Sequence, residues 1–452
     1  ERHRTKDYIR YTDYETAQVG VKYTDKNGTW ERTTFTSLAD GVTVTKIKKS
    51  SKNAPVNITL SYDDISTMAN YSEGDEVNIK YKKLADEGKA YLALVAHYPD
   101  YEKSELKNGG YATLTYVLNI GGTLSVTQAD APKDEQYAGD SQPKLTVSGA
   151  DEVYLITVTG RDYNMGELSA FASQSGCALI DLLYNRTTDF AKKYSAEGKF
   201  NYSNALDAHL AVYQPQFNAV TLTLKDGISE KSNEKLLRKQ RFKKKLDPAL
   251  SQRSYYAGRY AYLCCSGYSA PRLYGMWTGE WNTGWGSKYT MDANVNLQTS
   301  SMNTGNISSS PIGYAYFILR QLPDWEENAL ATHGFTDAIQ APVNTDGDKA
   351  VITETCYPYP FRYWNAGSSW MIQPLYETLQ CYGDIKIPLS GEIDLDKLRS
   401  VLSVTADDLT DEDIRAIEDR GYLRLERDVL LPLLIKSANY WEQLMTPEYY
   451  TD

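Results

Sequence analysis

The segment Gly275-Met-Trp-Thr-Gly-Glu-Trp-Asn-Thr-Gly-Trp-Gly-Ser-Lys-Tyr-Thr-Met-Asp-Ala-Asn-Val-Asn-Leu-Gln298 carries more information than any other part of this chain. It combines four glycines with the alternating amides Asn294 and Asn296, and it holds three tryptophans, Trp277, Trp281 and Trp285. An exposed indole is costly in water unless a flat ligand face covers it, and the C–H face of a sugar ring is such a surface. Side-chain amides add donors and acceptors for hydroxyl groups or for a water molecule. The segment therefore predicts a carbohydrate site.

Length and composition place the chain among ordinary globular proteins with more than one domain. Its 452 residues are too many for one simple core, and 41% hydrophobic with 24% charged residues is typical of folded domains. The 59 acidic residues outnumber the 48 Lys and Arg residues, which gives a net charge of −11. That balance argues against nucleic acid or an anionic membrane as the main partner. No apolar run approaches the roughly 18 residues of a membrane span.

Neither a disulfide framework nor a metal site is predicted. Of the five cysteines, Cys264 and Cys265 are adjacent, and no Cys-x-x-Cys pair occurs. The four histidines are widely scattered, which argues against a zinc site, and we expect no cofactor. The chain starts at Glu1 without a methionine and ends abruptly at Asp452, so we expect further parts of the protein at both ends.

The first third of the chain is predicted to be β-structure. Asp25-Lys-Asn27-Gly28 predicts a hairpin turn, in which Asn-Gly suits the left-handed positions. Many short segments separated by Gly, Asp and Asn indicate a β-sandwich. The further predicted strands are Val42–Lys46, Val56–Tyr62, Val77–Lys82, Lys89–His97, Tyr111–Val117, Thr123–Thr127, Lys144–Val147 and Val153–Thr159.

From about residue 166 onward, helical patterns dominate. Ala170–Tyr194 and Asn204–Tyr213 are predicted helices, and Ala219–Leu224 is a predicted strand that returns to the sandwich. Eight Lys or Arg residues between Lys231 and Lys245 predict a solvated linker helix rather than a nucleic-acid-binding arm. Five later helices are predicted from their start and stop signals: Asp247-Pro248 to Gly267, Ser310-Pro311 to Pro323, Ser368–Tyr382, one begun by a capping box at Thr410–Asp413, and Arg424–Met445 with a kink at Pro432.

Several motifs in this order resemble glycoside hydrolase family 95. They are Trp-Gly-Ser-Lys-Tyr-Thr and Asn-Val-Asn-Leu-Gln within 285–298, the segments Thr16–Tyr23 and Arg32–Ser37, His209–Thr221, and Trp364-Asn-Ala-Gly-Ser-Ser-Trp370. The family contains inverting α-L-fucosidases and related α-L-galactosidases. The resemblance implies an N-terminal β-supersandwich, a helical linker, an (α/α)6 barrel and a C-terminal β-domain.

Placed on this sequence, the resemblance predicts a multidomain fold of β followed by α. Residues 1–165 would form the β-sandwich domain, whose start we expect to be missing. Residues 166–245 would form the helical linker with its returning strand, and residues 246–452 the first part of the (α/α)6 barrel.

The resemblance also implies a mechanism and two catalytic residues. Inverting glycosidases place an acid and a base roughly 6.5–9.5 Å apart, with a water between the base and the sugar. In family 95 an asparagine positions this water and an aspartate polarises the amide. Asn296 matches the water-positioning asparagine and Asn294 its neighbour, whereas the motif of the polarising aspartate is not found in this chain. The general-acid glutamate is expected just beyond Asp452.

Six residues are predicted to bind substrate: Asp292, Trp277, Trp285, Asn344, Asp346 and Trp364. Fucosidases tend to carry a histidine where this chain has Asp292, and their His-His-Asn-Thr-Asp segment appears here as Pro342-Val-Asn-Thr-Asp346-Gly, without either histidine. These departures put specificity for fucose in doubt. Other roles remain open for these residues: capping of loops for the asparagines, a plain turn at 344–346, and packing beneath a loop for the tryptophans. For Asp292 they are a hydrogen bond inside the barrel or service as a substitute acid or base.

The predicted function is removal of a terminal α-L-fucosyl or α-L-galactosyl unit from a glycan with inversion. Two alternatives are a catalytically silent carbohydrate-binding homologue and another (α/α)6 enzyme such as a glycoside phosphorylase. The expected partners are an oligosaccharide or glycan substrate and the remainder of the same polypeptide. The expected source is a bacterium, with the protein secreted, periplasmic or on the cell surface.

Overall fold

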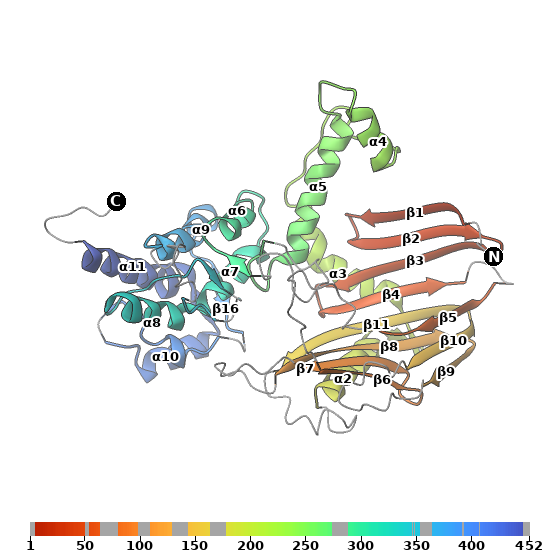
Figure 1. Cartoon of the computed structure of the whole chain (residues 1–452), viewed down its shortest axis with the longest axis horizontal. Coiled ribbons are helices and arrows are strands. Elements are labelled where there is room, and N and C mark those ends of the chain that lie inside the picture. The colour runs from red at the N-terminus through yellow and green to blue at the C-terminus, as the bar shows by residue number, and fades with distance from the viewer. Residues whose placement is uncertain are drawn as a thin grey trace, which may run out of the picture. The chain divides into compact units, whose positions relative to one another are not determined.

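The computed structural model describes residues 5–49, 54–63, 80–97, 109–128, 143–162, 178–273, 288–345, 347, 349–352, 364–390, 393–405 and 407–445. The chain divides into two compact units, Glu1–Pro215 and Gln216–Asp452. The division falls in the last turn of helix α3 (Tyr202–Phe217). Figure 1 shows the strands of the first unit and the helices of the second.

The first unit is built on two antiparallel sheets. The larger sheet has eight strands in the order β1-β2-β3-β4-β11-β8-β7-β6, and the smaller one has the order β5-β10-β9. The strands are β1 (Lys6–Asp13), β2 (Gln18–Asp25), β3 (Gly28–Ser37), β4 (Val42–Lys48), β5 (Val56–Leu60), β6 (Lys80–Asp86), β7 (Tyr91–His97), β8 (Gly110–Ile120), β9 (Thr123–Thr127), β10 (Lys144–Ala150) and β11 (Glu152–Asp162). The strands predicted from Val42 to Thr159 are therefore confirmed where the structure describes them.

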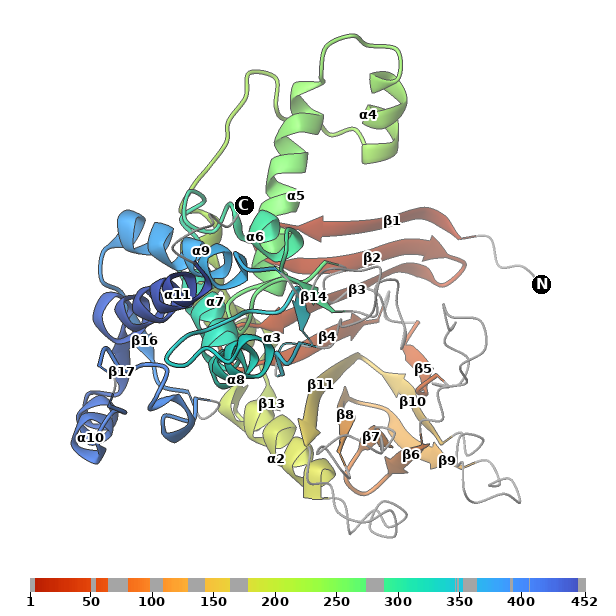
Figure 2. The same cartoon turned by 60° about the vertical axis from the view of Figure 1, so that its left-hand side comes forward.

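Each face of the large sheet has its own core. Val44, Leu114 and Ile156 point to one face, where they pack against helix α2 (Ala178–Lys193) and the start of α3. Figure 2 shows α2 beneath the sheet, close to β11 and β8, with which it is in contact. Leu92, Val117 and Val153 belong to the opposite face and pack against the small sheet. Because β7 lies between both layers, all seven of its residues are buried.

The hairpin predicted at Asp25–Gly28 is present, with different central residues. Asp25 pairs with Gly28, so Lys26 and Asn27 form the turn. The Asp25 side chain accepts a hydrogen bond from the Asn27 N–H at 2.7 Å, which fixes the turn locally. Gly28, with a φ of 127°, begins the next strand.

The second unit is helical. Its helices are α4 (Asn233–Gln240), α5 (Pro248–Cys265), α6 (Asn294–Thr299), α7 (Ser309–Leu319), α8 (Leu322–His333), α9 (Gly367–Tyr382), α10 (Asp411–Arg420) and α11 (Leu431–Leu444). Short strand pairs join β14 (Tyr289–Thr290) to β15 (Asn344–Thr345) and β16 (Lys386–Pro388) to β17 (Tyr422–Arg424). Over the described residues, no helix combines the length and apolarity needed to cross a bilayer.

The predicted caps at Asp247, Thr410 and Gly383 are confirmed, whereas two others are wrong. Helix α5 is capped by Ser266 rather than by Gly267, and Ser310 lies inside α7 instead of capping it. The Asp247 side chain accepts from the Ala249 N–H ahead of α5, with Pro248 in the first turn. Thr410 and Asp413 form a reciprocal capping box at the start of α10. Gly383 ends α9 with a φ of 77°, which a residue with a Cβ adopts only under strain.

Three predictions about elements are wrong. Ala219–Leu224 is not a strand, because its backbone bonds to side chains of α5: Leu222 to Tyr256 and Leu224 to Gln252. Pro323 does not end α7, which stops at Leu319. It lies in the first turn of α8, where its missing N–H costs nothing.

The third wrong prediction is the single helix over Arg424–Met445. It begins instead as a π-helical turn, Leu425–Leu430, before α11. The Leu431 N–H bonds the carbonyl of Glu426, five residues back. Pro432 has no N–H to bond the carbonyl four residues before it, which fits a wider turn at this point.

Candidate functional site

Three segments that are distant in sequence meet in the second unit. β14 pairs with β15, so Thr290 lies opposite Asn344, and the Met291 N–H donates to the Val343 carbonyl at 2.7 Å. The buried Ser368 hydroxyl accepts from the Ala341 N–H at 3.0 Å, which joins the start of α9 to the same segment. The structure thus brings the segments of Asp292, Asn344 and Trp364 together.

Asn294 and Asn296 lie in helix α6, not in an extended strand. Successive side chains of a helix are rotated by about 100° around its axis, so the side chains of Asn294 and Asn296 point about 200° apart. The alternating spacing predicts an extended segment with both amides on one side, and this prediction is wrong because the segment is helical. Their catalytic roles remain predictions.

The Asn296 amide is held at both ends by protein groups. Its Nδ2 donates to the Trp370 carbonyl at 2.7 Å, and its Oδ1 lies 3.1 Å from the Tyr314 hydroxyl. Tyr314 is fully buried, and burial raises the pKa of its phenol well above the usual 10, so it stays a donor. Its one proton is shared with the Met371 carbonyl at 2.8 Å. The amide keeps one N–H and one lone pair for a water molecule.

Asp292 follows β14 directly and carries an unsatisfied acceptor. Its side-chain Oδ1 is buried and, among the residues that the structure describes, has no hydrogen-bond partner. A buried carboxylate oxygen without a donor is costly, and a ligand hydroxyl would supply one. Within the same described ranges, the Asn294 side chain makes no hydrogen bond, so its amide is open to a ligand as well.

Trp364 lies at the entrance to α9 and is half-buried. A Cβ added to Gly367 would come within 2.8 Å of both the Trp364 ring and the Ala341 carbonyl, so the three groups are closely packed. The next residue, Asn365, accepts from the Tyr440 hydroxyl at 2.9 Å. The position suits the predicted role of Trp364 as a wall of the sugar site, which remains a prediction.

Three of the six predicted binding residues, Trp277, Trp285 and Asp346, lie outside the described residues, as does Trp281. Tyr314 and Gln298 are residues of the site that the sequence reasoning missed. Gln298 donates to the Leu273 carbonyl at 3.2 Å, while its Oε1 is buried without a partner in the described part of the chain. No local sequence pattern identifies Tyr314, because only the fold brings this residue of α7 next to Asn296 of α6. No group of three or more potential metal ligands occurs among the described residues.

Two family profiles match consecutive parts of the chain. Residues 201–389 match the profile described as the glycosyl hydrolase family 95 catalytic domain. This part of the chain is therefore similar to a family-95 catalytic domain. Residues 1–166 match the N-terminal domain of glycosyl hydrolase family 65. The resemblance inferred from the sequence motifs is confirmed, and Asp292, Asn294, Asn296, Asn344 and Trp364 all lie inside the family-95 match.

Two curated relatives of this chain are named as fucosidases. The chain is 26% identical over 218 residues to Probable alpha-fucosidase A of Aspergillus niger, covering 45% of this chain and 26% of that protein. It is 24% identical over 311 residues to Alpha-L-fucosidase 2 of Arabidopsis thaliana, covering 66% of this chain and 34% of that protein. The chain thus spans about a third or less of the length of these relatives. Together these matches support a glycoside hydrolase.

A solved structure shares the fold. It is titled "Putative kojibiose phosphorylase from human microbiome" and matches with a TM-score of 0.50 at 12% identity, covering 85% of this chain and 44% of that one. The two sheets, the helices that follow them and this likeness confirm the predicted fold class, a β-supersandwich followed by a helical linker and helices of an (α/α)6 barrel.

Proposed function

We propose that the protein hydrolyses a terminal α-L-galactosyl or α-L-fucosyl unit of a glycan with inversion, using a water molecule positioned by Asn296. The family-95 match and the two relatives named as fucosidases support the reaction class and the kind of sugar. The observation that carries the proposal is the buried Oδ1 of Asp292, which has no donor among the described residues. A sugar hydroxyl is the donor that would satisfy it.

Asp292 favours galactose over fucose. L-Fucose is 6-deoxy-L-galactose, so the galactosyl unit offers one more hydroxyl. A site with a buried hydrogen-bonding group discriminates strongly against a substrate that leaves this group unpaired, whereas an apolar pocket discriminates weakly against an added hydroxyl. Since fucosidases tend to carry a histidine here, the carboxylate of Asp292 supports an α-L-galactoside as the better substrate.

Asn296 would orient the attacking water rather than accept its proton. The Tyr314 hydroxyl and the Trp370 carbonyl fix the amide plane, which leaves one donor and one acceptor for the water. In the reaction, the water oxygen bonds to the anomeric carbon, the bond to the leaving oxygen breaks, and a general acid protonates that oxygen. A carboxylate must take the proton from the water, because an amide oxygen is a weak base. The family resemblance implies an aspartate that polarises the amide and a general-acid glutamate, both from later barrel segments, and we propose that this aspartate takes the proton.

The test uses the full-length gene product and a panel of aryl α-L-galactosides and α-L-fucosides, followed by proton NMR. Hydrolysis with inversion releases the β-L sugar first. Asn296→Ala should lower kcat by about 100-fold or more, the scale of a lost general acid–base contribution. Asn439→Ala is the matched control, because that amide also makes two hydrogen bonds to one neighbouring segment.

Three outcomes would contradict the proposal. The first is turnover that requires phosphate, which would indicate a phosphorylase. The second is saturable sugar binding without release of sugar, which would indicate a silent binding protein. The third is first appearance of the α-L anomer, which would indicate retention.

A further inference from the structure

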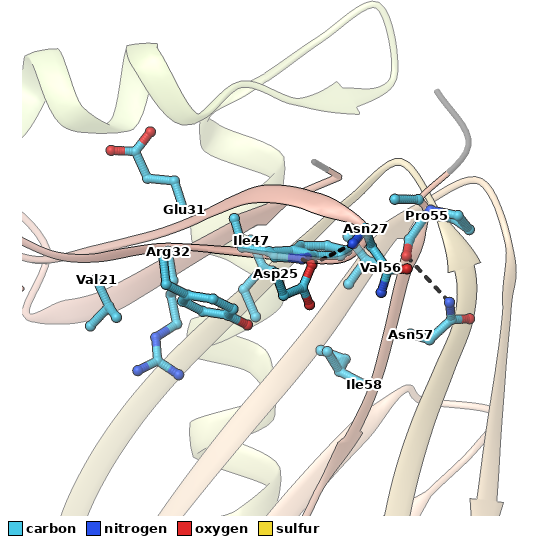
Figure 3. A pocket seen from close by; sticks show the side chains of 13 residues that line it. Val21, Asp25, Asn27, Glu31, Arg32, Ile47, Pro55, Val56, Asn57 and Ile58 are labelled. Carbon is cyan, nitrogen blue, oxygen red and sulfur yellow. Dashed lines mark hydrogen bonds between the residues drawn. The ribbon is translucent and has the colours of Figure 1, made fainter. Parts of the chain in front are cut away.

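A cavity of about 470 Å³ opens on the first unit, on the face of the large sheet that carries the small sheet. Its floor is formed by β2, β3 and β4, and its wall by residues 54–58, which include the start of β5. Figure 3 shows the side chains that line it. The volume lies within the range of about 300–1,000 Å³ that is usual for small-molecule sites.

The cavity exists because the small sheet is narrower than the large one. Its strands pack over Leu92, Val117 and Val153 of β7, β8 and β11. Strands β2 and β3 lie further toward the β1 edge of the large sheet. The edge strand of the small sheet, β5, therefore forms a wall beside an open floor.

The floor presents two aromatic rings. Tyr23 lies directly opposite Trp30, and Val21 lies opposite Arg32, so these four side chains share one face of the sheet. Trp30 packs with its inner side on the core between the sheets. Its Nε1 donates to Asp25 Oδ1 at 3.1 Å, which fixes the orientation of the indole. The platform is thus preformed, with little side-chain entropy left to lose on binding.

Polar groups surround this platform. In Figure 3 Arg32 lies toward one end of the cavity and Asn57 toward the other, with Asp25 between them. The Asn57 amide is held by the Gly149 N–H at 2.9 Å and by the Pro55 carbonyl at 3.2 Å. In the part of the chain that the structure describes, the Arg32 guanidinium makes no ion pair, and it is exposed.

We propose that this cavity binds a saccharide ring of a glycan, at a site separate from the family-95 catalytic domain. Indole and phenol rings meet the C–H face of a pyranose, while planar amide, carboxylate and guanidinium groups bind pairs of vicinal hydroxyls. An apolar ligand would contact the rings but would make no use of the polar groups around them. A peptide strand added to β5 would use the strand edge but not the floor of Tyr23, Trp30 and Arg32.

The test is binding of neutral oligosaccharides of two to four residues to the full-length protein, first on an immobilised panel and then by calorimetric titration of the best ligand. Arg32→Ala and Tyr23→Ala should each weaken binding about tenfold, the effect of one lost charge-assisted hydrogen bond or one stacked ring. Lys22→Ala removes a cation from the opposite face of β2 and should leave binding unchanged. Trp30→Phe should remove the change in tryptophan fluorescence that accompanies binding.

The variants separate this site from the catalytic one. Arg32 is exposed, so Arg32→Ala should keep the wild-type melting temperature even if a change at Tyr23 does not. If Arg32→Ala does not affect oligosaccharide binding and Asp292→Ala abolishes it, the oligosaccharide binds only in the second unit. That result would overturn the proposal. Absence of binding to every saccharide on the panel would overturn it too. Hydrolysis of aryl α-L-glycosides is measured separately, so failure of this proposal and failure of the proposed hydrolysis are distinguishable.

Discussion

The Asn296 amide is oriented by two groups that lie 18 and 74 residues further along the chain, the Tyr314 hydroxyl and the Trp370 carbonyl. Tyr314 contacts the amide from within the core, so it is a positioning residue. Tyr314→Phe keeps the ring and removes the donor to Oδ1. We expect kcat to fall about tenfold with KM nearly unchanged, since one hydrogen bond of about 1 kcal/mol no longer holds the amide.

A merely structural role of Tyr314 predicts a different result. In that case Tyr314→Phe would lower the melting temperature and leave kcat unchanged for the folded fraction. Steady-state kinetics with thermal unfolding of the same samples distinguishes the two. Equal kcat values for the variant and the wild type would contradict the positioning role.

His209 makes the stability of the first unit depend on pH. Its Nδ1 accepts from the Leu38 N–H at 3.1 Å, its ring stacks on Phe35 and Tyr213, and burial lowers its pKa to about 4. The unfolded chain binds a proton near pH 6.5 and the folded chain only near pH 4. Stability therefore falls as the pH drops from about 7 to about 4, by up to about 1.4 kcal/mol per pH unit.

The variant His209→Asn tests this dependence. Its Oδ1 can accept the same N–H without titrating, although the lost ring lowers stability at pH 7 by about 2 kcal/mol. We expect a smaller loss of melting temperature between pH 7 and pH 4.5 in the variant than in the wild type. Parallel curves over this interval would show that another group is responsible.

At the residue level, sequence motifs predicted Asn296 and Asn344, and the structure places the segments that carry them together. The roles of both residues in binding and catalysis remain predictions. Tyr314 was not found, because a buried tyrosine in an apolar helix has no local signal for its partner. The free acceptor of Asp292 could not be predicted either, since it depends on which donors the fold brings near.

Among the elements, α8 holds the segment that carries Asn344. The buried Asn328 donates from Nδ2 to the carbonyls of Gln340 and Ala350, at 3.1 and 2.7 Å, and accepts from the Ile352 N–H at 3.0 Å. Asn328→Ala removes the side-chain hydrogen bonds to these three backbone groups. We expect a loss of about 3 kcal/mol in unfolding free energy, because buried polar groups without partners cost about 1–3 kcal/mol each.

Chemical denaturation followed by circular dichroism measures this loss. Glu327→Ala, an exposed neighbour on the same helix, is the control and should change stability by less than about 0.5 kcal/mol. The Asn328 variant should also lose glycosidase activity at a lower temperature than the control. Equal stability of the two variants would contradict the role of Asn328.

Local signals predicted the long helices better than the short ones. The caps at Asp247 and Thr410 were predicted because a cap needs only neighbouring residues. Helix α6 has six residues and no side-chain cap, so its helical state depends on contacts such as that of Asn296 with α9. Helix α8 was missed because Pro323 was interpreted as a stop rather than as a first-turn residue.

For the whole molecule, the order of β-structure and helices was predictable and the sheet topology was not. Alternating Val and Thr predicted β4, but nothing local indicates that β11 pairs with β4 on one side and β8 on the other. The cavity beside β5 follows from this arrangement, because it depends on how far the small sheet extends over the large one. Its lining residues, such as Trp30 and Asn57, lie in different sheets and share no motif.

The central claim is that Asp292 binds a sugar hydroxyl in the family-95 domain. The most direct test is the ratio of kcat/KM for an aryl α-L-galactoside to that for the matching α-L-fucoside, measured for the full-length wild type, Asp292→Ala and the exposed control Asp419→Ala. We predict that the wild type and the control prefer the galactoside and that Asp292→Ala loses this preference by about tenfold or more. The same ratio in all three proteins, or no hydrolysis of either substrate, would contradict the claim.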